Sequence, residues 1–176
     1  MQREWKEIEN FDESFNRRTK ALLDLLELHM GNDSYVDMLD VGCGLMFAKD
    51  YFAKKRGIEY YGVDYKKRAE DTLVCDLNKK EFPQRKFDLF LIAGCLEYVE
   101  DLEWFFEKIG DMCKKTVCLS YCLIELNPDI GVRQSNAWKN HLSENMIIDA
   151  MKKQGFLVSQ KEIYNKKTML FIFKKE

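Results

Sequence analysis

Two aspartates and two glycines stand where strand-like segments of this sequence end. The segment YVDMLDVG, at 35–42, runs into Asp40-Val-Gly42-Cys-Gly44. Glycine has no Cβ, so the backbone there can turn tightly and approach a ligand closely. The segment IEYYGVD ends at Asp64, twenty residues after Gly44. A carboxylate at this place can accept hydrogen bonds from both hydroxyls of a ribose.

A third aspartate completes the pattern. Asp76 ends the segment DTLVCD and is followed by Leu77. Its carboxylate or neighbouring backbone can meet the amino group of an adenine while Leu77 lies against the ring. Each acid alone is more typical of a surface turn or a helix cap. Three acids at three successive strand ends, in this order, predict a nucleoside-binding pocket.

Alternating strand-like and helix-like segments must position these residues. A helix is predicted over 12–30, with a further short helix or arm at 5–11. Later helices are predicted at 45–57, 101–113 and 143–154, and an irregular loop at 127–141. Strands are predicted at 35–42, 58–64, 71–76, 87–94, 116–125, 156–165 and 168–175, the last two joined as a hairpin at Asn-Lys-Lys. We therefore expect an α/β, Rossmann-like, doubly wound and mostly parallel seven-stranded sheet, with helices on both faces and a C-terminal antiparallel hairpin.

Length and composition favour one domain over 1–176, with an N-terminal helical cap at 1–33 and an α/β core at 34–176. The formal net charge is −2, from 28 basic and 30 acidic residues, so we expect no nucleic-acid partner. No apolar run approaches membrane-spanning length and the N-terminus is not a secretory signal, which predicts a cytoplasmic protein without membrane insertion. The six cysteines form no Cys-x-x-Cys pair and only two histidines are present, so no metal site is predicted and the cysteines are interpreted as apolar core residues.

The motifs MLDVGCG, YYGVD, LVCDL and FDLFLIAGCLEYVED closely resemble those of the class I S-adenosylmethionine-dependent methyltransferases. The resemblance runs from about Val36 to Tyr121. It implies S-adenosylmethionine as cofactor, with the first motif beside its methionine part, the second at the ribose, the third at the adenine and the fourth near the methyl group. The cofactor-binding residues implied are Asp40, Gly42, Cys43, Gly44, Asp64, Tyr65, Asp76, Leu77, Ala93 and Gly94.

The chain departs from the family pattern in two places. The connection at 64–71 is too short for the usual helix, which leaves that side of the adenine pocket undefined. Leu96-Glu97-Tyr98 stands where many members have Leu-Glu-His, so one usual candidate near the acceptor is missing. A nucleotide-dependent oxidoreductase is disfavoured because Phe47 occupies the position of the third small residue of a dinucleotide fingerprint.

The acceptor is expected to contact the predicted loop at 127–141 and the N-terminal helices. His141 is a candidate general base, because an imidazole titrates near neutrality; the alternative is a histidine that caps or packs the next helix. Tyr121 is a second catalytic candidate through its hydroxyl. Arg133 can bind a phosphate or carboxylate, or form a structural ion pair with Glu97 or Glu125.

The predicted substrate-binding residues are Glu97, Tyr98, Arg133, Asn136 and Trp138. We expect Trp138 either to stack on a sugar or to cover the hydrophobic core. Trp5, Phe11 and Phe15 are expected to form either a lid or a packing face. The pattern R-x4-W-x2-HLS is similar to that of small methyltransferases from bacterial surface-glycan pathways. This similarity implies O-methylation of a small acceptor: a sugar, a nucleotide-sugar or a phosphate-bearing glycan precursor of polysaccharide biosynthesis.

Other functions stay open from the sequence. They are N-methylation of another small metabolite, and non-catalytic nucleoside binding by a protein of the same fold. A homodimer is also compatible with the sequence. Methylation of nucleic-acid amino groups is disfavoured, because AGCL stands where an Asn/Asp-Pro-Pro-Tyr/Phe motif would be expected and no basic stripe is present.

Overall fold

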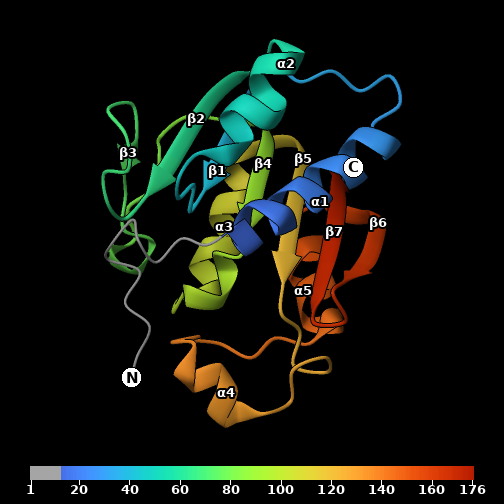
Figure 1. The fold of residues 1–176 in the computed structure, drawn as a ribbon. Helices are drawn as coiled ribbons and strands as arrows, with labels where there is room; N and C mark the ends of the chain where they lie inside the picture. The colour runs from blue at the N-terminus through green and yellow to red at the C-terminus, as the bar shows by residue number, and fades with distance from the viewer. Residues whose placement is uncertain (1–12) are drawn as a thin grey trace.

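Seven strands form one sheet in the computed structural model, which describes residues 13–176 (Figure 1). Their spatial order is β3-β2-β1-β4-β5-β7-β6, with β7 antiparallel to both of its neighbours and the other pairs parallel. The predicted mostly parallel sheet with a C-terminal hairpin is confirmed. The predicted arm at 5–11, with Trp5 and Phe11, lies outside the described residues. The strands are β1 (Asp37–Val41), β2 (Glu59–Asp64), β3 (Leu73–Val74), β4 (Phe87–Ala93), β5 (Cys113–Tyr121), β6 (Phe156–Tyr164) and β7 (Thr168–Lys175).

The central strands are buried on both faces, which explains their nearly continuous apolar sequences. In β4, Leu89 and Leu91 belong to one core while Phe90 and Ile92 belong to the other, because successive side chains point to opposite faces of a strand. The alternation continues in β5, where Cys118 lies in the first core. The sheet therefore separates two hydrophobic cores.

Helices cover both faces of the sheet (Figure 1). On one face, α1 (Glu13–His29) buries Leu22, Leu23 and Leu26 beside Phe52. On the other face lie α3 (Leu102–Met112) and α5 (Glu144–Lys153). The side-chain oxygen of Ser143 accepts a hydrogen bond from the backbone N–H of Met146 at 3.2 Å, so Ser143 caps α5 as predicted. No helix within residues 13–176 has both the length and the apolar character needed to cross a bilayer.

The segment predicted as one helix at 45–57 is divided. Met46 has a positive φ of 58°, and the chain then forms a π-helical turn, η2 (Lys49–Ala53), and the short α2 (Lys54–Arg56). Gly57, at φ 67°, ends it in the left-handed conformation that glycine accepts readily. The predicted end is confirmed, whereas the predicted uninterrupted helix is wrong.

Other predicted boundaries differ as well. The strand predicted at 71–76 pairs only over Leu73–Val74, where both side chains are exposed at the edge of the sheet. The loop predicted at 127–141 contains a helix, α4 (Ile130–Ser135), because Asp129 accepts a hydrogen bond from the backbone N–H of Val132 at 3.0 Å and caps it. The strand predicted at 116–125 begins earlier, at Cys113, which pairs with Phe87.

The C-terminal hairpin turns where the sequence predicts. Asn165 and Lys166 have positive φ angles of 52° and 57°, and Lys167 N–H donates to the carbonyl of Tyr164 at 3.3 Å. Two successive positive φ values define the turn whose twist matches that of the flanking strands. The resulting edge strand, β6, changes register between Val158 and Gln160.

Candidate functional site

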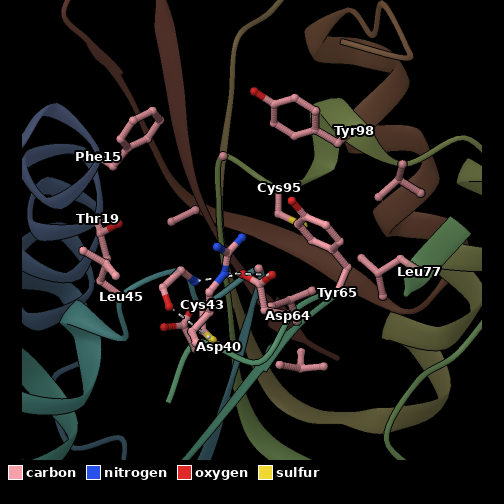
Figure 2. A pocket seen from close by; sticks show the side chains of 18 of the residues that line it. Phe15, Thr19, Asp40, Cys43, Leu45, Asp64, Tyr65, Leu77, Cys95 and Tyr98 are labelled. Carbon is pink, nitrogen blue, oxygen red and sulfur yellow. Dashed lines mark hydrogen bonds and ion pairs between the residues drawn. The ribbon is translucent and has the colours of Figure 1, made fainter. Parts of the chain in front are cut away.

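A cavity of about 460 Å³ opens at the carboxyl ends of β1, β2 and β4 (Figure 2). Ligands of parallel α/β sheets bind at this edge, and the volume is within the usual range for small-molecule pockets, about 300–1,000 Å³. Every residue predicted to bind the cofactor lines this cavity: Asp40, Gly42, Cys43, Gly44, Asp64, Tyr65, Asp76, Leu77, Ala93 and Gly94.

The turn after β1 requires a bare backbone at Gly42. Its N–H and that of Cys43 both donate to the carbonyl of Val63, at 2.8 and 3.0 Å. Gly42 has a φ of +72°, and a Cβ there would lie only 2.8 Å from both Cβ and Sγ of Cys95. A side chain at this position would strain the turn and collide with the segment that follows β4. The glycine therefore lets the β1 turn and the β4 end meet at the cavity.

Asp64 links the end of β2 to this turn. Its Oδ2 accepts a hydrogen bond from Gly44 N–H at 3.1 Å, and its Oδ1 accepts one from Lys66 N–H at 3.2 Å. The Nε of Arg68 lies 3.2 Å from Oδ1, in an ion pair whose two side chains are only 3% and 6% exposed. The carboxylate is thus fixed from three directions at the cavity wall. Sequence reasoning missed Arg68, although its spacing of four residues from Asp64 was a usable signal.

Asp40 is a buried acid with an altered protonation equilibrium. It is 4% exposed and accepts a hydrogen bond from the Tyr60 hydroxyl at 2.7 Å. Burial raises its pKa to about 7; the Tyr60 hydrogen bond opposes the shift, and the negative charge of Asp64 adds to it. Asp40 can therefore exchange a proton near neutral pH inside the cavity.

The third acid begins a short helical turn at the other end of the cavity. Asp76 accepts a hydrogen bond from Asn78 N–H at 3.1 Å and so caps η3 (Leu77–Lys79). The Asn78 side chain in turn donates to the carbonyl of Tyr98 at 3.0 Å. This bond holds η3 beside the turn η4 (Leu96–Tyr98). In Figure 2, Leu77 and Tyr98 lie on one side of the cavity, and Phe15 and Thr19 of α1 lie on the opposite side.

Sequence reasoning missed part of the wall that α1 provides. Arg18 and Thr19 line the cavity, as does Phe15, for which the sequence predicts either a lid or a packing face. Arg18 precedes the buried Leu22 and Leu26 by one and two helical turns, so all three lie on the same side of α1. That spacing is the signal that could have identified Arg18.

Arg133 lies outside the cavity wall, in the interior. Its side chain is 0% exposed, and all of its donor nitrogens are engaged. Nη1 donates to the Cys122 carbonyl at 2.8 Å; Nη2 donates to the Tyr121 hydroxyl at 3.1 Å and to the Asn140 carbonyl at 3.2 Å; Nε donates to Nδ1 of His141 at 2.9 Å. Among residues 13–176 it has no carboxylate within ion-pair distance, so the alternative pair with Glu97 or Glu125 is also not formed. Arg133 organises the segment after β5 and does not face a ligand in the cavity.

The structure corrects the prediction of a catalytic hydroxyl at Tyr121. This residue is fully buried and does not line the cavity. Its hydroxyl donates to Oδ1 of Asn140 at 2.6 Å and accepts from Leu142 N–H at 2.9 Å as well as from Arg133. One donor and two acceptor positions exhaust what a hydroxyl offers. Burial also raises the pKa of Tyr121 to about 12.

Of the other residues predicted to bind the substrate or to act as a base, one lines the cavity and four do not. Tyr98 lines it, whereas Glu97, Asn136, Trp138 and His141 do not. Glu97 is buried and accepts a hydrogen bond from Cys122 N–H at 3.1 Å, and the Trp138 ring packs on the Arg133 guanidinium with 4.8 Å between its centroid and Cζ. Asn136 donates to the Val132 carbonyl at 2.9 Å. His141 is exposed, and because its Nδ1 accepts a hydrogen bond, the neutral ring carries its proton on Nε2.

The chain is similar to known methyltransferases in both sequence and fold. Residues 39–119 match the family model described as a methyltransferase domain. Phosphoethanolamine N-methyltransferase 3 of Arabidopsis thaliana is 26% identical over 121 residues, which cover 59% of this chain; the matched part spans only about a quarter (24%) of that relative's length.

Solved structures agree with this match at the level of the fold. Magnesium protoporphyrin IX methyltransferase of Synechocystis PCC 6803, with bound S-adenosylhomocysteine, has a TM-score of 0.72 at 14% identity, covering 92% of this chain and 83% of that one. The 1,6-didemethyltoxoflavin-N1-methyltransferase of Burkholderia thailandensis, with bound 1,6-didemethyltoxoflavin and S-adenosylhomocysteine, has a TM-score of 0.69 at 16% identity, covering 93% of this chain and 79% of that one. In both comparisons nearly the whole chain is superposed.

Proposed function

We propose that this chain transfers the methyl group of S-adenosylmethionine to a small-molecule acceptor, because residues 39–119 match a methyltransferase domain and the fold is that of solved methyltransferases. The proposal rests above all on three acids and two glycines from the ends of three strands, β1, β2 and β3, which meet at one cavity. The alternative of non-catalytic binding is disfavoured, because a scaffold has no need for this complete set.

The residues of the cavity fit the parts of the cofactor. Asp64 is proposed to hold the ribose hydroxyls, Asp76 and Leu77 the adenine, and Asp40 the positively charged amino group of the methionine part. The bare backbone at Gly42 lets the β1 turn and the segment after β4 meet beside the proposed cofactor site, since a Cβ there would reach Cys95. When bound, S-adenosylmethionine supplies a methyl group already activated by its sulfonium. What the chain must add is alignment of the acceptor and exclusion of water.

The acceptor is proposed to bind between α1 and η4, beyond Gly94. Phe15, Thr19 and Tyr98 line this part of the cavity and favour a small molecule. O-methylation of a sugar, a nucleotide-sugar or a phosphate-bearing glycan precursor stays our proposal, supported by the sequence similarity of the segment that contains Arg133 and Trp138. N-methylation is the second candidate, favoured by the match to the plant phosphoethanolamine N-methyltransferase.

Calorimetry with S-adenosylmethionine and S-adenosylhomocysteine tests the first half of this proposal. Saturable binding of both is expected from the purified protein. The second half is tested with methyl-labelled cofactor and fractions of a small-molecule extract, where transfer of label to an acceptor is expected. Absence of binding by a folded protein would overturn the assignment as a methyltransferase, and binding without transfer to any fraction would favour the non-catalytic alternative.

Cofactor affinity is expected to rise with pH through neutrality. Asp40 has a pKa of about 7, and only its ionised form attracts the positively charged amino group of the ligand. Protonation at lower pH removes that attraction, so S-adenosylhomocysteine should bind roughly tenfold more weakly at pH 6 than at pH 8. Calorimetry across this range measures the effect. Asp40→Asn is the matched variant and should give weak binding that does not vary with pH; a flat profile in the unmodified protein would contradict the role given to Asp40.

His141→Gln is expected to leave turnover within about twofold of the unmodified protein. The imidazole lies outside the cavity wall, and its Nδ1 accepts a hydrogen bond from Arg133. Removing a true general base costs about 10²–10⁴-fold. Steady-state rates with the identified acceptor discriminate between these outcomes. A loss of 100-fold or more, with unchanged cofactor affinity, would restore His141 as the general base that the sequence suggested.

A further inference from the structure

Arg18 brings a positive charge into the cavity from α1. A Cβ built on Gly94 would lie 1.7 Å from its Nη2 and 2.2 Å from its Cζ, so the guanidinium lies directly against the bare Cα of Gly94. On its other side, Cζ is 5.6 Å from the centroid of the Phe15 ring, within the range of a cation–π contact. The glycine and the aromatic ring thus fix the charge at the end of β4.

No residue among 13–176 neutralises this charge. Arg18 forms no hydrogen bond or ion pair with any of them, and its Nε is buried without a partner. The other arginine of the cavity, Arg68, is paired with Asp64. A buried donor without an acceptor is costly, and a bound anion would supply the missing acceptor. Arg18 is therefore the feature of the cavity that the proposed cofactor contacts do not explain.

We propose that Arg18 is the subsite that binds an anionic group, a phosphate or a carboxylate, of the methyl acceptor. This inference rests on the proposed function, in which Gly94 lies near the methyl group. A guanidinium can hold either anion through two parallel N–H bonds, and this would orient the acceptor as well as attract it. Lys139 lines the same cavity and adds positive charge, although its Nζ is also 3.0 Å from Glu100.

The acidic residues of the cavity support an acceptor in place of the nucleoside as the partner of Arg18. Asp40, Asp64 and Asp76 come from the ends of β1, β2 and β3, whereas the guanidinium of Arg18 lies at the end of β4, which it reaches from α1. The competing occupant is the carboxylate of the cofactor's own methionine part. The two sources share one chemistry, so the test must separate them.

Inorganic phosphate is the probe for the subsite, titrated calorimetrically into protein saturated with S-adenosylhomocysteine. Saturable binding is expected, weakened about tenfold or more by Arg18→Met and less by Arg18→Lys, because a charge-assisted hydrogen-bond pair is lost in the first variant and partly kept in the second. Arg17→Met is the matched control, since Arg17 is the exposed neighbour on α1, and it should change nothing. Thermal unfolding of each variant shows that the fold is kept.

A second pair of titrations separates the acceptor from the cofactor. S-adenosylhomocysteine carries the methionine-derived carboxylate, and 5′-methylthioadenosine does not. Arg18→Met should leave the affinity for both within about threefold. Loss of affinity for S-adenosylhomocysteine alone would assign Arg18 to the cofactor and overturn the inference, as would phosphate binding that is absent or unaffected by Arg18→Met. Failure to bind either nucleoside would instead overturn the proposed function, and the phosphate titration of the free protein would still test Arg18.

Discussion

Asp64→Ala is expected to weaken the binding of S-adenosylhomocysteine by at least about 100-fold. Two hydrogen bonds from ribose hydroxyls to a carboxylate contribute about 1.5–3 kcal/mol each, and both are lost together. The same carboxylate accepts hydrogen bonds from Gly44 N–H at 3.1 Å and Lys66 N–H at 3.2 Å, so its removal should also loosen the turn that lines the cavity. Calorimetry or fluorescence titration measures the change.

Two variants make this result interpretable. Asp64→Asn keeps the shape and part of the hydrogen bonding, so it should fall between the unmodified protein and the alanine variant. Asp71→Ala removes an exposed carboxylate whose ion pair with Lys49 lies outside the cavity wall, and it should leave affinity unchanged. Unaltered binding by a folded Asp64→Ala variant would mean that the nucleoside does not contact the end of β2.

Arg133→Leu is expected to lower the free energy of unfolding by about 3–5 kcal/mol. Leucine fills part of the volume but leaves the carbonyls of Cys122 and Asn140, and the Tyr121 hydroxyl, without their buried donor. Each buried polar group that loses its partner costs about 1–3 kcal/mol. Urea unfolding followed by circular dichroism gives the difference directly.

The matched control is Arg56→Leu, which removes an exposed arginine paired with Glu27. Exposed ion pairs contribute about 1 kcal/mol or less, so this variant should unfold at nearly the original midpoint. The result separates two interpretations of Arg133. A stable Arg133→Leu protein that has lost only acceptor binding would support the sequence-based prediction of a ligand-binding arginine over the structural role seen here.

The cavity residues that we propose to bind the cofactor could be predicted from the sequence because their positions are determined locally. A strand end in a parallel sheet has a known place in space, so an acid such as Asp64 directly after an apolar run is positioned by its own segment. Gly42 is determined in the same way by the turn it must make. All residues predicted on this basis line the cavity.

The residues predicted to bind the acceptor could not be placed in this way. A polar residue in the segment after β5 can point into the cavity or into the protein interior, and the sequence pattern is the same in both cases. Arg133, Trp138 and His141 suggest ligand binding by their types, yet they contact one another in and around the interior. Arg18 shows the converse, since consecutive arginines in an amphipathic helix resemble a solvated surface. Only the packing of α1 on the sheet directs one of them, and not Arg17, into the cavity.

The two ends of the sheet affect how the protein behaves at high concentration. An unpaired strand edge is a template on which a second chain can add by main-chain hydrogen bonds and begin an aggregate. At one end, β3 offers only Leu73–Val74 as such a template. At the other end, β6 is longer, but its register shift between Val158 and Gln160 interrupts the regular edge. Lys161 and Glu162 on this strand are exposed, and an added strand would have to pack beside their charges. Both edge strands of the sheet, β3 and β6, therefore disfavour the addition of a strand from a second molecule.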